Sequence, residues 1–551
     1  MGKIKYLVGF FTFFSLALTL NAQDRYAVYF KFKPQSAYSL SKPQEFLTSK
    51  ALARRLREGI QPDSLDLPVS SKYLEQVAPL AKYVLYTSKW MNAALLVTDK
   101  VGAEKMSALP FVAKVELAAK GFLPPPNGRI DSEDKPLKSR KDPKLNTREL
   151  GLTANSYDFQ NSLIGIDQMH KEGFTGDGVT VAVFDAGFPG VKTASSFAHL
   201  FTNNQILGQR DFVRTWNNDV FIDNQHGTNV LSLIAANEPA KLVSGAYDSD
   251  FILVITEEVA TEYQVEEYNW VRGAEYADSL GVDIINSSLG YWDFDDPAMN
   301  YTIADLDGKT AVITKGATIA AEKGILVVNS VGNYGSRGTS SLVAPADAKG
   351  ILSIGSVKTT GDVSGFSSRG PTGDGRIKPE LAAFGDSPVL IRSNGVVGSS
   401  NGTSFSAPQI AALAAGLWEA RPEWTKDQLI LNLLRSATQY DKPDNLLGYG
   451  VPNFMDAYYG EILSVEEEEN QQWKVYPNPV ESDEISILYG TGLRSEIEVI
   501  DTNGRILLRS EMVRTDPKSP YRVQLKGINS GIYLIQLSEG ALIWKTKLLK
   551  R

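Results

Sequence analysis

The hydrophobic pattern of residues 156–460 alternates between short apolar runs and longer segments with helical spacing. The apolar runs are nearly continuous and fall at 179–184, 251–255, 282–286, 325–330 and 350–357. Helical segments separate or follow them at 274–280, at 310–323 and after residue 404. Strands that are apolar on both faces and separated by helices indicate a parallel sheet covered on both sides. We therefore expect an α/β domain built on a parallel sheet.

The pattern changes on either side of this region. Residues 23–123 combine a strand-like alternation at 26–33, an amphipathic helix at 43–57 and strand candidates at 93–98 and 111–117, which predicts a small α/β domain. Residues 473–551 predict an all-β sandwich, with strands at 484–489, 496–500, 505–509, 521–525, 532–537 and 542–547. Asn503-Gly504 indicates a tight hairpin and Glu539-Gly540 a weaker turn.

Three segments connect or precede these domains. Residues 1–22 are typical of a signal peptide, because Lys3 and Lys5 precede an apolar run that is short for a bilayer span and the segment ends at the small Ala22. The alternative is an uncleaved membrane anchor. Residues 124–155 are charged and dotted with proline, which predicts an exposed linker suited to cleavage. Residues 461–472 contain the acidic run 466–469 and predict a solvated linker.

The amino-acid composition excludes several kinds of catalytic or metal site. The chain has 551 residues, of which 43% are hydrophobic and 22% charged, an ordinary balance for a soluble protein of several domains. Its net charge of −8 gives no indication of nucleic-acid binding. The lack of cysteine excludes disulfides, thiolate zinc sites and a cysteine nucleophile. Only His170, His199 and His226 are available for a histidine-based mechanism.

A serine bracketed by small residues stands out in the run 401–408, Asn-Gly-Thr-Ser-Phe-Ser-Ala-Pro. Because proline is tolerated best in the first turn of a helix, Pro408 places the start of the alanine-rich helix that follows near Thr403 or Ser404. A serine there lies beside free backbone N–H groups and the positive end of the helix dipole. That environment suits a nucleophile that must stabilise an oxyanion. The alternative is a Gly/Ser-rich loop before a core helix.

Ser404 needs a base, and His226 is the best candidate. Apolar residues at 230, 231, 233 and 234 have helical spacing, so the His226 ring is expected at the start of a buried helix. The positive end of that helix dipole disfavours the charged imidazole and keeps the ring able to accept a proton. The sequences around His170 and His199 are typical of ordinary surface or packing histidines.

A carboxylate and an amide complete the candidate site. Asp185 follows the apolar run 179–184, and at the carboxyl end of a parallel strand it would face the crevice where open α/β sheets bind ligands. There it could hold the His226 tautomer and stabilise the imidazolium, although a turn or cap would also use an aspartate. Asn333 projects from the end of another strand candidate, and its amide and the Ser404 backbone N–H could be the two oxyanion donors.

Together these residues, in the order Asp, His, Asn, Ser, resemble the subtilase family of serine peptidases. The matching stretches are Val-Ala-Val-Phe-Asp-Ala-Gly at 181–187, His-Gly-Thr at 226–228, Val-Gly-Asn at 331–333 and Gly-Thr-Ser-Phe-Ser-Ala-Pro at 402–408. Two more stretches resemble the family's substrate-pairing strand and the segment before its nucleophile, at 286–290 and 366–371. Val331 stands where the family more often has alanine, which is expected to alter a pocket wall and not the chemistry.

The resemblance implies a subtilisin-like fold and a secreted serine endopeptidase that acts on protein or peptide substrates. The residues carried over are the catalytic Asp185, His226 and Ser404, the oxyanion-hole Asn333, and the substrate-binding Ser288, Leu289 and Gly290. Residues 288–290 would offer backbone groups to an extended peptide by strand addition. The attacked peptide bond would form an acyl-enzyme that water releases, and no cofactor is required for that chemistry.

The flanking domains carry looser resemblances. Residues 23–123 are similar to the inhibitory propeptide of subtilases, which implies a zymogen, and the match rests on position and strand-helix pattern. The C-terminal module resembles the sorting domain of the type IX secretion pathway of Bacteroidota through Tyr-Pro-Asn-Pro at 476–479, Gly-Ile-Tyr at 531–533 and a basic end at 545–551. This implies recognition by type IX machinery, export across the outer membrane, and a secreted or cell-surface protein without a transmembrane anchor.

Three other classes of protein share some of these sequence features. Gly-Ser-Ser-Asn-Gly at 398–402 fits the nucleophile elbow of α/β-hydrolases, but that family needs its histidine after the serine, and no histidine follows His226. Sedolisins share a Gly-Thr-Ser nucleophile but use Glu and Asp partners, which the context of His226 argues against. A non-catalytic surface binding protein on a subtilase scaffold is the third alternative, and the intact catalytic positions argue against it.

The sequence does not fix a metal site. Subtilases often bind structural calcium, and an exported protein without disulfides would gain stability from such an ion. Asp305-Leu306-Asp307-Gly308 is the candidate loop, but a plain turn accounts for the same residues.

Overall fold

The computed structural model describes residues 23–34, 36–122, 148–149, 157–463, 474–488, 494–501, 505–513, 520–539 and 542–551. Among these, the residues up to Phe454 form one compact unit and those from Met455 form another. The predicted signal peptide, the acidic run 466–469, the Asn503-Gly504 hairpin and Gly540 of the weaker turn lie outside the described residues. Of the predicted linker 124–155, only Arg148–Glu149 is described.

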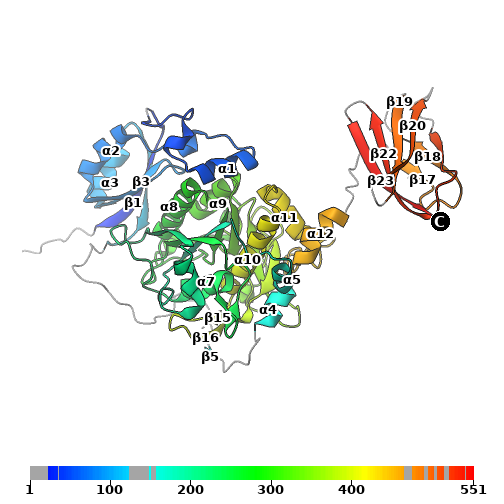
Figure 1. Cartoon of the computed structure of the whole chain (residues 1–551). Coiled ribbons are helices and arrows are strands. Elements are labelled where there is room, and N and C mark those ends of the chain that lie inside the picture. Colours follow the sequence, from blue (N-terminus) through cyan, green and yellow to red (C-terminus); the bar gives the residue numbers. More distant parts are fainter. Residues whose placement is uncertain are drawn as a thin grey trace, which may run out of the picture. The chain divides into compact units, whose positions relative to one another are not determined.

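A parallel sheet forms the centre of the larger unit (Figure 1). It has seven strands in the order β14-β13-β12-β11-β6-β10-β7. Its strands are β6 (Thr180–Asp185), β7 (Ile206–Asp211), β10 (Asp250–Ile255), β11 (Ile284–Ser287), β12 (Leu326–Ser330), β13 (Leu352–Val357) and β14 (Leu381–Phe384). Every residue of β6, β12 and β13 is buried, as expected for a sheet covered on both faces. The predicted α/β class with a parallel sheet is confirmed.

Four helices pack in two pairs around this sheet. One pair is α7 (His226–Ala235) with α10 (Thr403–Ala420), and the other is α8 (Val265–Leu280) with α9 (Val312–Glu322). Helix α10 begins at Thr403, as Pro408 predicted. The proline is accommodated inside the helix because the carbonyl four residues earlier, on Ser404, accepts a hydrogen bond from Ser288 Oγ (2.8 Å). The expected helix at 274–280 was too short, since α8 already starts at Val265.

Shorter elements surround the start of α10. Strand β16 (Val397–Asn401) leads into Gly402 and pairs with both β15 (Asp386–Ile391) and β5 (Arg148–Glu149), so the predicted linker contributes one short strand. The smaller elements of this unit are β8 (Asn237–Glu238), β9 (Leu242–Val243), α4 (Asp158–Leu163), α5 (Ile166–Lys171), α6 (Ala198–Thr202) and α11 (Lys426–Arg435). Helix α12 (Phe454–Leu463) extends into the segment predicted as an acidic linker, whose residues 461–463 are therefore helical.

The N-terminal domain is a four-stranded antiparallel sheet in the order β2-β3-β1-β4. Its elements are β1 (Asp24–Phe30), β2 (Tyr83–Ser88), β3 (Ala93–Thr98), β4 (Val112–Ala119), α1 (Ser49–Arg57), α2 (Ser71–Val77) and α3 (Lys100–Ser107). The predicted helix over 43–57 is wrong in its first half, which is a 3-10 turn at Pro43–Glu45. The α-helix starts only after Thr48, because the Thr48 side chain accepts the Ala51 N–H (3.2 Å) and caps the helix there.

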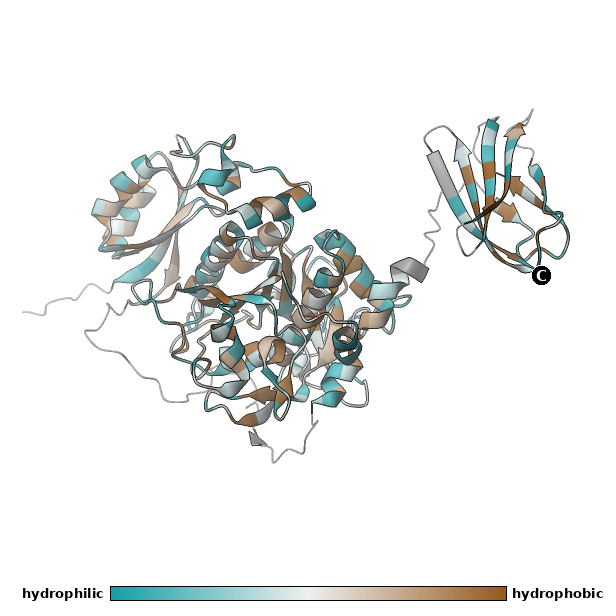
Figure 2. Cartoon of the chain, in the orientation of Figure 1, coloured by the Kyte–Doolittle hydropathy of each residue, from teal (hydrophilic) through white to brown (hydrophobic). Residues whose placement is uncertain are grey.

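This domain packs on helix α8 of the parallel-sheet domain. One face of its sheet covers α2 and α3 through Val77 and Met106. The other face places Leu95 in the same hydrophobic cluster as Tyr268 and Trp270 of α8. Figure 2 shows hydrophobic residues along the strands and hydrophilic residues on outward helix faces. Burial of apolar surface therefore joins the two domains within one unit.

The C-terminal module is all-β, as predicted. Two sheets, β17-β18-β21 and β20-β19-β22-β23, enclose a core that includes Ile485 and Val523 from the first sheet and Val499 and Ile535 from the second. The strands are β17 (Lys474–Tyr476), β18 (Glu484–Leu488), β19 (Arg494–Ile500), β20 (Ile506–Val513), β21 (Tyr521–Gln524), β22 (Gly531–Glu539) and β23 (Leu542–Lys550). Among the described residues, no helix has both the length and the apolar character needed to cross a membrane.

Candidate active site

Asp185 and His226 meet at the carboxyl end of the central sheet. Asp185 is the last residue of β6 and is fully buried, and His226 is the first residue of α7, with its side chain 12% exposed. The His226 Nδ1 atom lies 2.9 Å from both carboxylate oxygens of Asp185. Because an ionised carboxylate only accepts hydrogen bonds, this contact places the proton on Nδ1 and leaves Nε2 as the basic nitrogen.

The backbone holds this pair in place. Asp185 Oδ1 also accepts the N–H of Ala186 (2.8 Å), which fixes the carboxylate. Gly227 allows α7 to approach β6 closely, since a Cβ at Gly227 would lie 2.9 Å from the Cβ of Asp185 and 2.3 Å from the Gly187 carbonyl oxygen. A side chain at position 227 would therefore push the imidazole away from the carboxylate.

Ser404 lies in the first turn of α10, next to residues 288–290, which follow strand β11. Its Oγ donates to the Ser288 carbonyl (3.2 Å), and its own carbonyl accepts from Ser288 Oγ (2.8 Å). The next residue, Phe405, has its ring centroid 5.6 Å from that of His226, so the start of α10 adjoins the imidazole. Ser404 is 7% exposed, which leaves its hydroxyl at a water-poor edge of the sheet.

Asn333 also faces the start of α10. Its Oδ1 accepts from both the N–H (2.9 Å) and the Oγ1 (3.0 Å) of Thr403. Thr403 Oγ1 in turn accepts the N–H of Gly332 (3.3 Å). Because the carbonyl end of the amide is held by Thr403, its Nδ2–H donors remain for an acceptor next to Ser404.

The predicted substrate segment follows strand β11. Ser288 and Leu289 are buried and Gly290 is half-buried. Asn329 Nδ2 donates to the Leu289 carbonyl (3.1 Å), which ties the segment to β12. Beyond Gly290, Tyr291 forms an antiparallel bridge with Ala344. The segment is thus anchored at both ends, as a template for an extended peptide requires.

A buried acid that the sequence did not reveal lies behind this site. Glu257 follows β10, and its Oε1 accepts a hydrogen bond from the Tyr291 hydroxyl. Burial raises the pKa of Glu257 to about 7, with the charge of Asp185 adding to the rise. Burial and the charge of Glu257 hold the pKa of the neighbouring Glu266 well above its usual range. Glu257 therefore links two places near the site. It follows the end of β10 that pairs with Asp185, and it binds Tyr291, the residue after the substrate segment.

The other two histidines and the candidate calcium loop serve local structure. His170 Nε2 contacts the Gly245 carbonyl (3.1 Å), and burial lowers the pKa of both His170 and His199. Asp305 Oδ2 accepts from the N–H (2.8 Å) and the Oγ1 (2.6 Å) of Thr302, and Asp307 Oδ1 accepts from the N–H of Thr310 (2.8 Å). Within the described residues, no group of three or more His, Asp or Glu side chains could hold a metal. These contacts are those of a plain turn, the alternative that the sequence offered for this loop.

A second buried polar cluster joins the N-terminal domain to α8, and we call it the ionic anchor. It consists of Arg54, Arg55, Asp66, Asp278 and Lys323. Arg55 Nη2 lies 3.0 Å from Asp66 Oδ1 and 2.9 Å from Asp278 Oδ1, and Lys323 Nζ lies 3.1 Å from Asp66 Oδ2. The side chains are at most 3% exposed, so these charges depend on one another for solvation.

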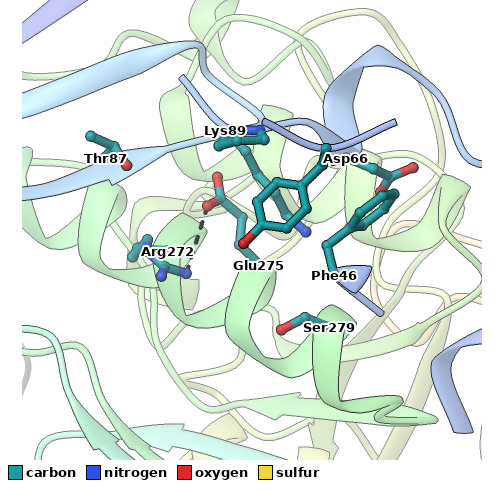
Figure 3. A pocket seen from close by; sticks show the side chains of 9 residues that line it. Phe46, Asp66, Thr87, Lys89, Arg272, Glu275 and Ser279 are labelled. Atoms are coloured by element: carbon teal, nitrogen blue, oxygen red, sulfur yellow. Dashed lines mark ion pairs between the residues drawn. The ribbon is translucent and has the colours of Figure 1, made fainter. Parts of the chain in front are cut away.

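A pocket of about 180 Å³ opens beside this anchor (Figure 3). Helix α8 contributes Arg272, Glu275 and Ser279, and the N-terminal domain contributes residues such as Asp66 and Lys89. Glu275 pairs with Arg272 (3.7 Å) and accepts from Trp90 N–H (2.9 Å), so its charge is already satisfied. The pocket is smaller than most ligand sites and none of its lining residues belongs to the candidate active site. It is a gap in the domain interface.

Three family models match consecutive parts of the chain. The one described as "Subtilase family" matches residues 176–450. The one described as "Peptidase S8 propeptide domain, Bacteroidota" matches residues 25–134. The one described as "Secretion system C-terminal sorting domain" matches residues 474–551.

Several curated proteins are similar to about half of the chain. Subtilisin from Bacillus pumilus is 30% identical over 306 residues, which cover 55% of this chain and 99% of the relative. Subtilisin amylosacchariticus from Bacillus subtilis subsp. amylosacchariticus is 31% identical, covering 54% of this chain and 72% of the relative. Among solved structures, MycP1 from Mycobacterium smegmatis aligns with 22% identity and a TM-score of 0.45, covering 58% of this chain and 89% of that one.

Proposed function

Because the chain belongs to the subtilase family and is a serine endopeptidase, we propose that Asp185, His226 and Ser404 form its catalytic triad. The observation that carries this proposal is the His226 Nδ1 contact of 2.9 Å to both oxygens of the buried Asp185, next to the helix start that holds Ser404. The three residues come from β6, α7 and α10, which meet at one end of the sheet.

The mechanism follows from these positions. Ser404 Oγ attacks the substrate carbonyl while His226 Nε2 takes its proton, and Asp185 stabilises the resulting imidazolium. The imidazolium then protonates the leaving amine, so the peptide bond breaks and an acyl-enzyme forms. Water, activated by the same imidazole, releases the acid product. The proton that Ser404 lost thus leaves with the amine, and His226 returns a proton from the water to Ser404 Oγ, so the enzyme is regenerated. We propose no cofactor for these steps.

The test of this function is hydrolysis of a denatured protein by the full chain after maturation, with the fragments identified by mass spectrometry. New peptide termini are expected in proportion to the amount of enzyme. Ser404→Ala is expected to release them roughly 10⁶-fold more slowly.

Asn333 is proposed to hold the oxyanion together with the backbone N–H of Ser404. Asn333→Ala is expected to lower kcat by about 10²–10³-fold with little change in KM, a magnitude measured for the corresponding amide of a subtilisin. Steady-state kinetics on a chromogenic peptide measures the two constants separately. Asn432→Ala, at a buried asparagine of α11, serves as control. If instead KM rises while kcat stays unchanged, Asn333 binds the substrate and does not selectively stabilise the transition state.

The chain is an exported zymogen: a propeptide domain precedes the peptidase and a sorting domain follows it. We propose that type IX machinery recognises the sorting domain and carries the protein across the outer membrane. We further propose that cleavage in 124–155 separates the propeptide. The described end of that domain, at Phe122, lies against Trp216 (ring centroids 6.3 Å) in the loop before His226, which supports an inhibitory position.

The ionic anchor is expected to hold the propeptide to the peptidase. Arg55→Ala removes a shared partner of Asp66 and Asp278, and breaking a buried ion pair costs about 3–5 kcal/mol. In the Ser404→Ala background, with the intact mass of the uncleaved chain verified, urea unfolding should show a clear fall in the midpoint for the transition of this unit. Lys105→Ala, at an exposed lysine of α3, is the matched control. Equal midpoints for both variants would show that the anchor adds no stability.

A further inference from the structure

The peptidase reaction fixes where one substrate side chain must lie, given the function proposed above. The attacked carbonyl has to sit within reach of Ser404 Oγ and the Asn333 amide, while the peptide before the cut runs along residues 288–290. These residues follow β11 and residues 331–333 follow β12, which is its parallel neighbour. The side chain of the residue that supplies the carbonyl therefore enters between these two segments.

Gly290 and Gly332 lie in the two segments at this place, and the side chain of Val343 lies close to both glycines. A Cβ at Gly290 would be 2.2 Å from Cγ2 of Val343, and a Cβ at Gly332 would be 2.9 Å from the same atom and 3.3 Å from Cγ1. The glycines leave a space between the segments, and the Val343 side chain closes one end of that space. Val343 is itself 2% exposed, so its methyl groups are packed and not turned toward solvent.

The backbone of Val343 is held in this position. The adjacent Ala344 exchanges both hydrogen bonds with Tyr291, at 2.8 Å and 2.9 Å, directly beyond Gly290. The Tyr291 hydroxyl is bound by the buried Glu257. The Val343 carbonyl accepts the N–H of Ala346 (2.9 Å). Because valine is also stiff about χ1, its methyl groups have little freedom to move aside for a large substrate side chain.

We propose that Val343 closes the subsite for the side chain on the acyl side of the cut, so that the enzyme cleaves after small residues such as alanine and serine. A large aromatic side chain would have to displace packed methyl groups, which a close-packed interior resists. Alanine needs only the space next to the two glycines. The specificity of the peptidase is thus set by one buried residue outside the proposed triad.

The experiment compares kcat/KM of the matured full chain on peptide p-nitroanilides that differ only in the last residue, alanine or phenylalanine. The unmodified enzyme is expected to prefer alanine by at least tenfold. Val343→Ala and Val343→Gly should raise the phenylalanine-to-alanine ratio, by at least roughly 10–200-fold for the glycine variant, the range that a single methylene group contributes in an apolar pocket. Val357→Ala, a buried valine at the end of β13, should leave the ratio unchanged.

Each outcome decides the question. A preference for phenylalanine in the unmodified enzyme would overturn the role of Val343 even if neither variant folds. An unchanged ratio in a variant that still hydrolyses the alanine substrate would overturn it as well. No hydrolysis of any substrate by the unmodified enzyme would instead refute the proposed triad and, with it, the inference that rests on it.

Discussion

Ser404→Ala is expected to lower kcat for peptide hydrolysis by roughly 10⁶-fold, the magnitude measured when the nucleophile of a subtilisin is removed. The physical reason is that alanine has no oxygen to attack the carbonyl or to carry the acyl group, so the covalent route is lost. Residual hydrolysis would come from water polarised by the oxyanion donors. The same variant is also expected to accumulate as the uncleaved chain, a result that would show that the enzyme cleaves its own linker.

The measurement is initial velocity on a peptide p-nitroanilide, with chain length followed by intact-mass spectrometry. Ser436→Ala is the matched control, because Ser436 is a buried hydroxyl whose Oγ donates to the Leu433 carbonyl (2.8 Å) and not to the site. The control should retain activity near that of the unmodified chain. Turnover of Ser404→Ala within tenfold of the control would contradict the assignment of the nucleophile.

Asp185→Asn is expected to lower kcat by about 10⁴-fold, the magnitude known for this change in a serine peptidase of another fold. An asparagine fits the same space, but its NH₂ group can donate to His226 Nδ1 and so favour the tautomer with the proton on Nε2. That tautomer cannot accept the Ser404 proton. The buried imidazolium would also lose its counter-charge.

Kinetics and thermal unfolding together test this second variant. The fold should persist, because Asp185 is replaced by a residue of nearly the same shape, so the unfolding temperature should change far less than kcat. Asp250→Asn, at the first residue of β10, is the control carboxylate. A loss of less than tenfold in Asp185→Asn would show that His226 is oriented by something else.

The sequence could locate the candidate site because each of its residues is marked locally. Asp185 ends one apolar strand and Asn333 follows another, and His226 and Ser404 each stand at a helix start. In a parallel sheet all strand ends of one kind lie on one edge, so local signals are enough to bring such residues together. The start of α10 was predictable for a similar reason, since Pro408 restricts the helix.

The features that could not be predicted depend on distant partners. Glu257 stands in an acidic run that is typical of an exposed loop, and its burial follows from Tyr291, 34 positions away. The first half of α8 was missed because Glu266, Glu267 and Gly273 obscure its apolar spacing. Arg54 and Arg55 belong to a helix that looks amphipathic and solvent-exposed, yet Asp278 of the other domain buries them. Local pattern contains no information on such contacts.

The most direct test of the triad is covalent labelling with a fluorophosphonate, which reacts with a serine only when a neighbouring base activates it. Peptide mapping of the matured chain should find one modified residue, Ser404, and the adduct should be lost in His226→Ala. No adduct at Ser404, or equal labelling of Ser404 in the chain without His226, would contradict the account.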